Sequence, residues 1–234
     1  MPDKDEAKWH RWTSCFDAAQ KEVVTLFHTR WMWRTMREMM NSSGIDQYVV
    51  VQDYFLRTYI GTMAIGIRRE VDADTRTTSL ARCLIMLSEC PRSVTRARFE
   101  QEIERTVDGE YQEEAKASFD GCAKPGAPAV DQEVVKRDLD LIRAAAAPVL
   151  PYTNQVIAHR QRTKTDVEFD SLTLLDFNNA LDAIGAVTKK YYRLRHPGMA
   201  LGALTPIVDP SFYKMFCSPW YTDAFSPLRE WDQE

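Results

Sequence analysis

The sequence lacks the local signatures of several common enzyme classes. It contains no glycine-rich phosphate loop, no serine–histidine–aspartate signature and no two cysteines at C-x-x-C spacing. Only four histidines occur in 234 residues, and a zinc site needs more histidines and closer ligand spacing. We therefore expect neither a metal nor any other cofactor.

The sequence also lacks a basic excess and an uninterrupted hydrophobic run. The net charge is −4, so no global field would attract nucleic acid, and any RNA contact would have to be local. The most apolar stretch, residues 48–67, contains Gln52, Asp53 and Arg57, which favours a buried helix over a membrane span. The acidic, polar first eight residues do not resemble a signal peptide. We expect a cytoplasmic protein without membrane contact, whose five cysteines are reduced.

Runs of alternating β-branched residues are missing as well, and apolar residues recur instead at intervals of three and four. This spacing is typical of amphipathic helices. It predicts an all-α bundle of five to six helices with no sheet. The predicted helices span residues 4–40, 45–72, 79–90, 92–119 (with a break near Gly109), 131–147 and 171–195.

The first predicted helix carries a stripe of unusual aromatic content. Its members, with one charged exception, are apolar: Trp9, Trp12, Phe16, Ala19, Val23, Leu26, Arg30 and Trp33. The stripe predicts a face packed in the core or against another helix. The second predicted helix is apolar on most faces, so we expect it to be central.

The chain changes character after residue 197. Four prolines alternate with aromatic residues from there to the C-terminus, without a helical period. So many aromatic residues are not typical of a disordered tail. The sequence therefore predicts a helical domain over residues 1–197. It also predicts an irregular, aromatic-rich C-terminal arm, residues 198–234, which packs on the bundle or on a partner.

The most informative segment follows two prolines, Pro148 and Pro151, which interrupt a helix. It reads Asn-x-x-Ile-Ala-His-Arg and places His159 about one helical turn after Asn154. Histidine titrates near neutral pH, so this pair is a candidate site for proton transfer or phosphate contact. The alternative is a partly buried histidine that caps its helix, and these residues alone favour that alternative.

The order of predicted elements and the Asn-x-x-Ile-Ala-His-Arg string together resemble the HEPN superfamily, and more narrowly its AbiU-like branch of bacterial abortive-infection proteins. Two further segments resemble that branch, residues 65–72 and the Thr-Thr-Ser-Leu-x-x-Cys-Leu run from Thr77. The resemblance covers residues 4–197. It implies a protein of phage defence or of a toxin–antitoxin system that binds or cleaves RNA through a groove around Asn154 and His159.

In HEPN ribonucleases an arginine precedes the polar residue of the motif, and Thr153 occupies that position here. The resemblance implies metal-independent RNA cleavage, with His159 and Asn154 as the catalytic candidates. The phosphate-binding candidates are Arg160, Arg162, Arg68 and Arg69. The substitution by Thr153 favours a non-catalytic module that binds RNA, a nucleotide or a protein partner, and the sequence leaves both alternatives open.

The second predicted helix carries two charge pairs at helical spacing, Asp53 with Arg57 and Arg68 with Asp72. An intrahelical salt bridge is one interpretation of the second pair. The alternative is that Arg68 or Arg69 faces His159 across the bundle.

A basic cluster ends the last predicted helix, at Lys189, Lys190, Arg193 and Arg195. Complementing the helix dipole is the favoured interpretation, and a nucleic-acid patch is the weaker one. The resemblance further implies a homodimer with one composite site, and RNA, a cognate antitoxin or a defence-system protein as partners. A third hypothesis is a plain helical scaffold that assembles through its aromatic arm.

Overall fold

The computed structural model describes residues 4–43, 49–153, 172–199 and 204. In this part of the chain α-helices dominate and no strand occurs, which confirms the predicted all-α class. Eight α-helices are present there, and six of them contain ten residues or more. None of the described helices combines the length and apolar character that a membrane crossing requires.

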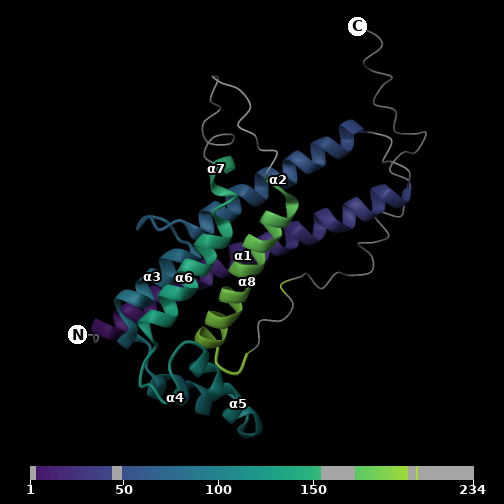
Figure 1. Ribbon diagram of the computed structural model, residues 1–234. Helices are drawn as coiled ribbons and strands as arrows, with labels where there is room; N and C mark the ends of the chain where they lie inside the picture. The colour runs from purple at the N-terminus through teal and green to yellow at the C-terminus, as the bar shows by residue number, and fades with distance from the viewer. Residues whose placement is uncertain (1–3, 44–48, 154–171, 200–203, 205–234) are drawn as a thin grey trace, which may run out of the picture.

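The helices follow one another as α1 (Lys4–Ser43), α2 (Val49–Val71), α3 (Leu80–Glu89), α4 (Arg96–Thr106), α5 (Gln112–Ala117), α6 (Gln132–Ala146), α7 (Leu150–Tyr152) and α8 (Leu174–Arg195). Three 3₁₀ turns surround α4 and α5: η2 (Pro91–Ser93), η3 (Gly109–Tyr111) and η4 (Ser118–Gly121). Helices α1 and α2 lie side by side, and α6 packs between α3 and α8 (Figure 1). Helices α4 and α5 close one end of the bundle, and α7 lies at the other.

The aromatic stripe of α1 forms much of the core, as predicted. Trp12, Phe16 and Val23 are at most 1% exposed, and each such burial contributes about 1.5–3 kcal/mol to folding. The charged exception, Arg30, is also buried. Its Nη1 donates to Oδ1 of Asp182 on α8 at 2.6 Å, so the charge within the stripe joins two helices.

Side-chain caps define where most of the long helices begin. Ser79 accepts a hydrogen bond from the backbone of Arg82 at the start of α3, and Thr95 caps α4 in the same way. Thr173 and Asp176 form a capping box at the start of α8. A cap of this kind contributes about 1 kcal/mol, so the local sequence explains why the observed starts lie within three residues of those predicted for α3, α6 and α8.

Residues 92–119 differ from the single, interrupted helix that the sequence predicted. The chain forms α4, leaves the helical conformation at Val107 and Asp108, and continues as η3 and α5. The break therefore falls next to the predicted position at Gly109. Phe99 and Ile103 of α4 and Phe119 of η4 are nevertheless buried in the core.

The expectation that α2 is central is correct only for its C-terminal half. Met63 and Ile67 are fully buried, whereas Val50 and Tyr54 are 81% and 65% exposed. The predicted pair of Asp53 and Arg57 is present at 2.7 Å. Arg68 forms no ion pair with Asp72 among the described residues, so that part of the prediction is wrong.

Helices α1 and α8 approach closely at Gly185. A Cβ atom at this position would lie 2.4 Å from Cζ of Phe27, so the contact requires glycine. We expect Gly185→Ala to lower the free energy of unfolding by about 1–3 kcal/mol. Gly61→Ala, which faces open space on α2, should raise it by about 0.5–1 kcal/mol through helix propensity. Urea denaturation of both variants measures this, and equal stabilities would contradict the observed α1–α8 packing.

The C-terminal arm is described only at its start. Gly198, just after the end of α8, has a φ of +74°, a left-handed conformation that glycine adopts readily and that does not continue the helix. Leu204 is buried, and its Cδ1 lies close to Gly185 on α8. Residues 205–234 lie outside the described part, so the division into a domain and an arm stays a prediction.

Candidate functional site

Most of the predicted site lies outside the described residues. Asn154, His159, Arg160 and Arg162 all fall in residues 154–171. The groove that the motif predicts around Asn154 and His159 therefore remains a prediction. The structure does describe Thr153, the last residue before it, and the two arginines of α2.

Thr153 is a packing residue. Its side chain is buried, with 1% of the residue exposed. Its hydroxyl lies 3.3 Å from the carbonyl oxygen of Ala64 on α2 and 3.2 Å from that of Val149. This contact holds the end of α7 against α2. The position that the sequence resemblance aligns with the arginine of HEPN ribonucleases is thus filled here by a small side chain in a closed interface.

The two arginines predicted on α2 are both exposed, and they differ in partners. Arg69 pairs with Glu22 of α1 at 3.3 Å. Arg68 lies one turn, about 6 Å along the axis, from Ala64, and it forms no ion pair among the described residues. The hydrogen bond to Asp53 and the charge of Asp53 raise the pKa of Arg57, and Tyr152 of α7 adds a smaller contribution. Arg68 and Arg69 lie four and five residues from Ala64 along α2, whereas Arg57 lies seven residues away, so Arg68 is the α2 cation nearest to the residue that contacts Thr153.

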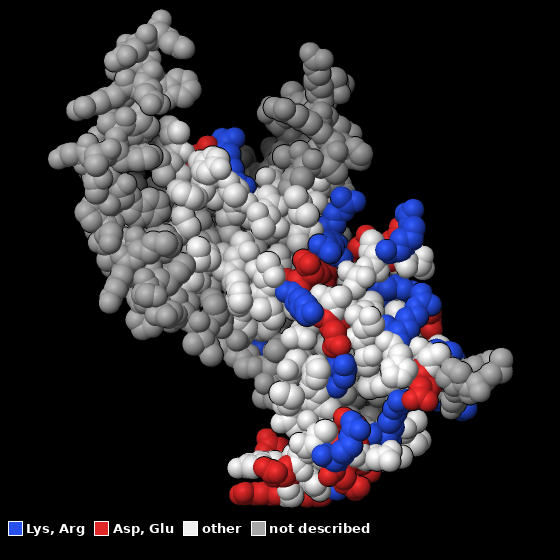
Figure 2. All heavy atoms as spheres, turned by 180° about the vertical axis from the view of Figure 1, so that it is seen from behind, with Lys and Arg blue, Asp and Glu red and all other residues white. Residues whose placement is uncertain are grey.

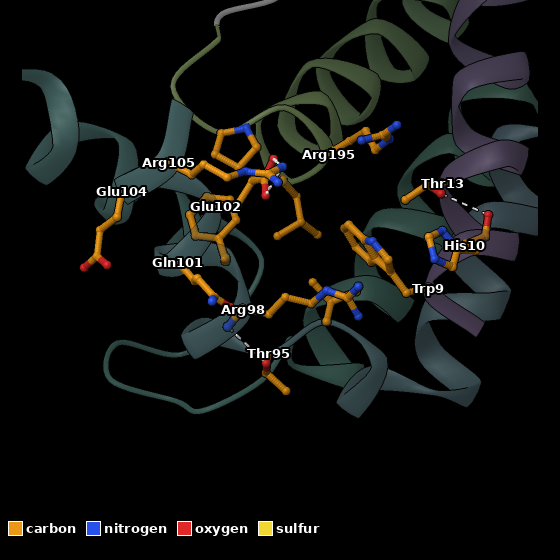
Figure 3. A pocket seen from close by; sticks show the side chains of 14 residues that line it. Trp9, His10, Thr13, Thr95, Arg98, Gln101, Glu102, Glu104, Arg105 and Arg195 are labelled. Carbon is orange, nitrogen blue, oxygen red and sulfur yellow. Dashed lines mark hydrogen bonds and ion pairs between the residues drawn. The ribbon is translucent and has the colours of Figure 1, made fainter. Parts of the chain in front are cut away.

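A cleft lies elsewhere, where the N-terminal part of α1 meets α4 and the end of α8. Its volume is about 730 Å³, which is within the usual range of small-molecule sites. Figure 3 shows Trp9, His10 and Thr13 on one side and the α4 side chains on the other. The charged and polar lining residues are His10, Thr13, Thr95, Arg98, Gln101, Glu102, Glu104, Arg105 and Arg195.

Each arginine of the cleft already has a partner. The guanidinium of Arg98 lies over the ring of Trp9, 5.2 Å from its centroid, and 3.6 Å from Glu6. Arg105 contacts both carboxylate oxygens of Glu102, at 2.8 and 2.9 Å. Arg105 is nevertheless largely exposed. Exposed ion pairs contribute little stability, so an incoming anion can replace these carboxylates at small cost.

The third arginine is held more firmly. Arg195 makes two hydrogen bonds to Asp17 of α1, at 3.1 and 3.0 Å, and His196 lies 3.7 Å from the same carboxylate. Burial, and then the charge of Arg195, lower the pKa of His196. This part of the cleft therefore ties α8 to α1 and is less open to exchange than the α4 arginines.

His10 is an exposed residue at the rim of the cleft. Its Nε2 lies 3.8 Å from Glu6, and its backbone carbonyl accepts the hydroxyl of Thr13 at 2.9 Å. Trp9 is partly buried and stacks on Trp12 with centroids 5.1 Å apart. The cleft thus combines an indole, an imidazole and guanidinium groups, which suit stacking, proton transfer and phosphate binding respectively.

Sequence reasoning missed this cleft. Its residues come from three segments, near positions 9–13, 94–105 and 194–197. No motif marks any of them. Trp9 belonged to the aromatic stripe of the first predicted helix and Arg195 to the basic cluster of the last one, but neither feature pointed to a cleft.

Two of the four side chains of that basic cluster, Lys190 and Arg195, are paired with carboxylates of neighbouring helices. Lys190 pairs with Asp138 of α6 at 2.6 Å, and the hydroxyl of Tyr191 donates to the same carboxylate at 2.8 Å. Figure 2, seen from behind relative to Figure 1, shows basic and acidic side chains interspersed over the described part of that rear face, with no continuous basic surface there. The arrangement favours a structural role for Lys190 over a nucleic-acid patch.

The cleft and Thr153 lie toward opposite ends of α6. In Figure 1, α4 is at the bottom of the bundle and α7 at the top. A helix of 15 residues is about 22 Å long, so the cleft residues and Thr153 belong to separate sites.

Among the described residues, no group of histidine, cysteine, aspartate or glutamate side chains has the arrangement of a metal site. Comparison with known proteins found no matching family model, no similar curated protein and no similar solved structure.

Proposed function

We propose that the protein binds single-stranded RNA as a HEPN-like component of bacterial phage defence or of a toxin–antitoxin system. The observation that carries the proposal is the cleft, in which Trp9, Arg98 and Arg105 lie together. The defence context rests on the sequence resemblance alone. The contact between RNA and the cleft would be local, as expected for a protein whose net charge of −4 provides no global attraction for nucleic acid.

The chemistry of the cleft suits a nucleotide better than a simple anion. Guanidinium groups bind phosphate with two parallel hydrogen bonds, and Arg98 and Arg105 are the arginines best placed to exchange their carboxylates. A base can stack on an aromatic ring with a gain of about 1–3 kcal/mol. Trp9 supplies such a ring beside Arg98.

The size of the cleft and the surrounding charges favour a short single strand over a duplex. A duplex spreads its phosphates over a long surface and is recognised by extended basic faces. The mixed charges visible in Figure 2 offer no such face on the described residues seen there. A single strand can place one or two nucleotides in the cleft and leave the rest in solvent.

Binding without cleavage is the favoured form of the proposal. Cleavage at the motif would need a cation to stabilise the developing phosphorane, and the family position for that cation holds the buried Thr153. The second candidate is cleavage, with His159 and Asn154 as predicted. Cleavage in the cleft is a separate candidate, because His10 lines the same walls as Arg98 and Arg105.

We propose a homodimer as the assembly, with a cognate antitoxin or defence-system protein as a further partner. The exposed apolar side chains of α2 support an interface there, since Val50 and Tyr54 would lose a large solvent-exposed area on association. The arm is the second element that the sequence assigns to assembly.

The test measures binding of a short fluorescein-labelled single-stranded RNA by fluorescence anisotropy. We expect the double variant Arg98→Gln/Arg105→Gln to bind at least about tenfold more weakly, with a salt dependence reduced by about 0.7 in log–log slope for each lost phosphate contact. Arg143→Gln, an exposed arginine of α6 outside the cleft, is the matched control and should bind as the wild type does.

The outcomes separate the candidates. If the wild type does not bind RNA, the proposed function is wrong. If the double variant binds like Arg143→Gln, the cleft is not the RNA site. The same mixtures run on a denaturing gel report cleavage, and a product lost in His159→Ala or in His10→Ala would replace binding by catalysis at the motif or at the cleft.

A further inference from the structure

Two cysteine thiols meet where α1 packs on α3. The Sγ atoms of Cys15 and Cys83 lie 2.9 Å apart, with the Cys83 thiol as the donor. Both cysteines are unbridged, Cys83 is buried and Cys15 is half-buried. A disulfide has an Sγ–Sγ distance of about 2.0 Å, so the two atoms need to approach by only about 1 Å.

The surroundings of Cys15 stabilise a thiolate. Hydrogen bonds from Cys83 and from the backbone N–H of Ser79 lower its pKa to about 7, against a smaller opposing effect of burial, and Arg82 and Arg11 act in the same direction. Ser79 is the N-cap of α3, so the sulfur lies at the positive end of a helix. Reactive cysteines occur in environments of this kind.

Helix α2 also reaches the cysteine pair, through the side chain of Glu70. Its Oε2 accepts the backbone N–H of Leu80 at 2.9 Å, and its buried Oε1 has no hydrogen-bond partner. Burial raises the pKa of Glu70 to about 8. The carboxyl group is therefore mostly protonated at neutral pH, and a carboxylate charge that would oppose the thiolate is largely absent.

Cys83 has the properties expected of the second cysteine of a disulfide with Cys15. Its hydrogen bond to Cys15 and its burial both raise the pKa of its thiol. It therefore stays protonated and shielded until a neighbouring sulfur becomes electrophilic.

We propose that Cys15 and Cys83 are a peroxide-sensitive thiol pair that is modified to an intramolecular disulfide. In the first step the Cys15 thiolate attacks an oxygen of hydrogen peroxide. An S–O bond forms, the O–O bond breaks, and the departing hydroxide takes a proton from solvent to become water. In the second step the Cys83 sulfur attacks the sulfenic acid, the S–S bond forms, and the hydroxyl leaves with the Cys83 proton as water. Two thiols are oxidised and one peroxide is reduced to two waters.

The other described cysteines lack this arrangement. Cys122 is fully buried, and burial raises the pKa of its thiol. Cys90 is half-buried and has no second thiol beside it among the described residues. The disulfide would also close a loop between positions 68 residues apart in the sequence, which favours stabilisation of the oxidised protein.

The test treats the reduced full-length protein with hydrogen peroxide and maps its peptides without reduction. We expect a Cys15–Cys83 cross-linked peptide, a loss of two hydrogen atoms from the intact mass, and a melting temperature higher by about 5 °C or more. The rate of Cys15 alkylation by iodoacetamide should rise with an inflection near pH 7.

Variants distinguish oxidation of the Cys15–Cys83 pair from unselective oxidation of the cysteines. Cys83→Ala should stop at a Cys15 sulfenic acid that dimedone traps, and Cys90→Ser should leave the cross-link unchanged. Arg82→Gln should slow the reaction by about threefold, whereas Arg76→Gln, which removes an arginine paired with Asp74 in the preceding loop, should not. Oxidation that goes to sulfinic acid at Cys15 without a cross-link in the wild type, or equal reactivity of Cys15 and Cys90, would overturn the proposal.

Discussion

Replacing Thr153 by arginine is expected to lower the free energy of unfolding by roughly 3 kcal/mol or more, although arginine is the residue that the sequence resemblance to HEPN ribonucleases would place there. The side chain of Thr153 is almost completely enclosed between α7 and α2. A guanidinium at this position either loses its water without a compensating anion or pushes α7 off α2. Urea denaturation followed by circular dichroism measures the change.

Two smaller substitutions serve as controls for this variant. Thr153→Ser keeps the hydroxyl that bonds Ala64 and Val149, so its effect should stay within about 1 kcal/mol. Thr153→Val keeps the volume and removes the hydroxyl, which should cost about 1 kcal/mol. If Thr153→Arg proves as stable as Thr153→Ser, α7 is not docked as described, and the position can hold an arginine.

Glu70→Gln is expected to stabilise the protein at pH 8 and to have little effect at pH 5. Folding raises the pKa of Glu70 from 4.5 to about 8 because its carboxyl group is buried. The folded state therefore holds a proton that the unfolded state has released between these values, and stability falls as the pH rises through this window. At 1.36 kcal/mol for each unit of pKa, the loss between pH 5 and pH 8 is on the order of 3 kcal/mol.

Glutamine has the shape of the protonated acid and does not titrate. It keeps an acceptor for the N–H of Leu80, so the variant should retain at pH 8 the stability that the wild type has near pH 5. Its melting temperature at pH 8 should rise by about 2–4 °C for each kcal/mol recovered. Glu89→Gln, an exposed change at the end of α3, should alter stability at neither pH by more than about 0.5 kcal/mol. A pH dependence that Glu70→Gln leaves intact would show that the carboxyl group is not buried as described.

Glu70 lies near Cys15 and Cys83, so its charge state affects the reactivity predicted for the cysteine pair. The charge of Glu70 raises the pKa of the Cys83 thiol, and that of Cys15 raises the pKa of Glu70. In Glu70→Gln the thiolate of Cys15 faces a neutral neighbour at every pH. Its reaction with peroxide should then lose the part of its pH dependence that comes from Glu70.

The sequence by itself determined the helices, several of their starts and much of the core. The apolar spacing of α1 identified Trp12, Phe16 and Val23, all of which are buried. Ser79 lies at the predicted start of its helix and caps α3. These features depend on hydrogen bonds and side-chain periodicity within one or two turns, which a sequence displays directly.

Only the tertiary structure decided which side chains meet across helices. The cleft joins Trp9, Arg98 and Arg195, which no spacing in the sequence connects. Cys15 contacts Cys83, although the two cysteines are 68 residues apart in the sequence. Thr153 is buried because α7 docks on Ala64, far away in the chain. Such contacts depend on the angles and distances at which helices pack, and these arise from the fit of whole side-chain surfaces, which local periodicity does not encode.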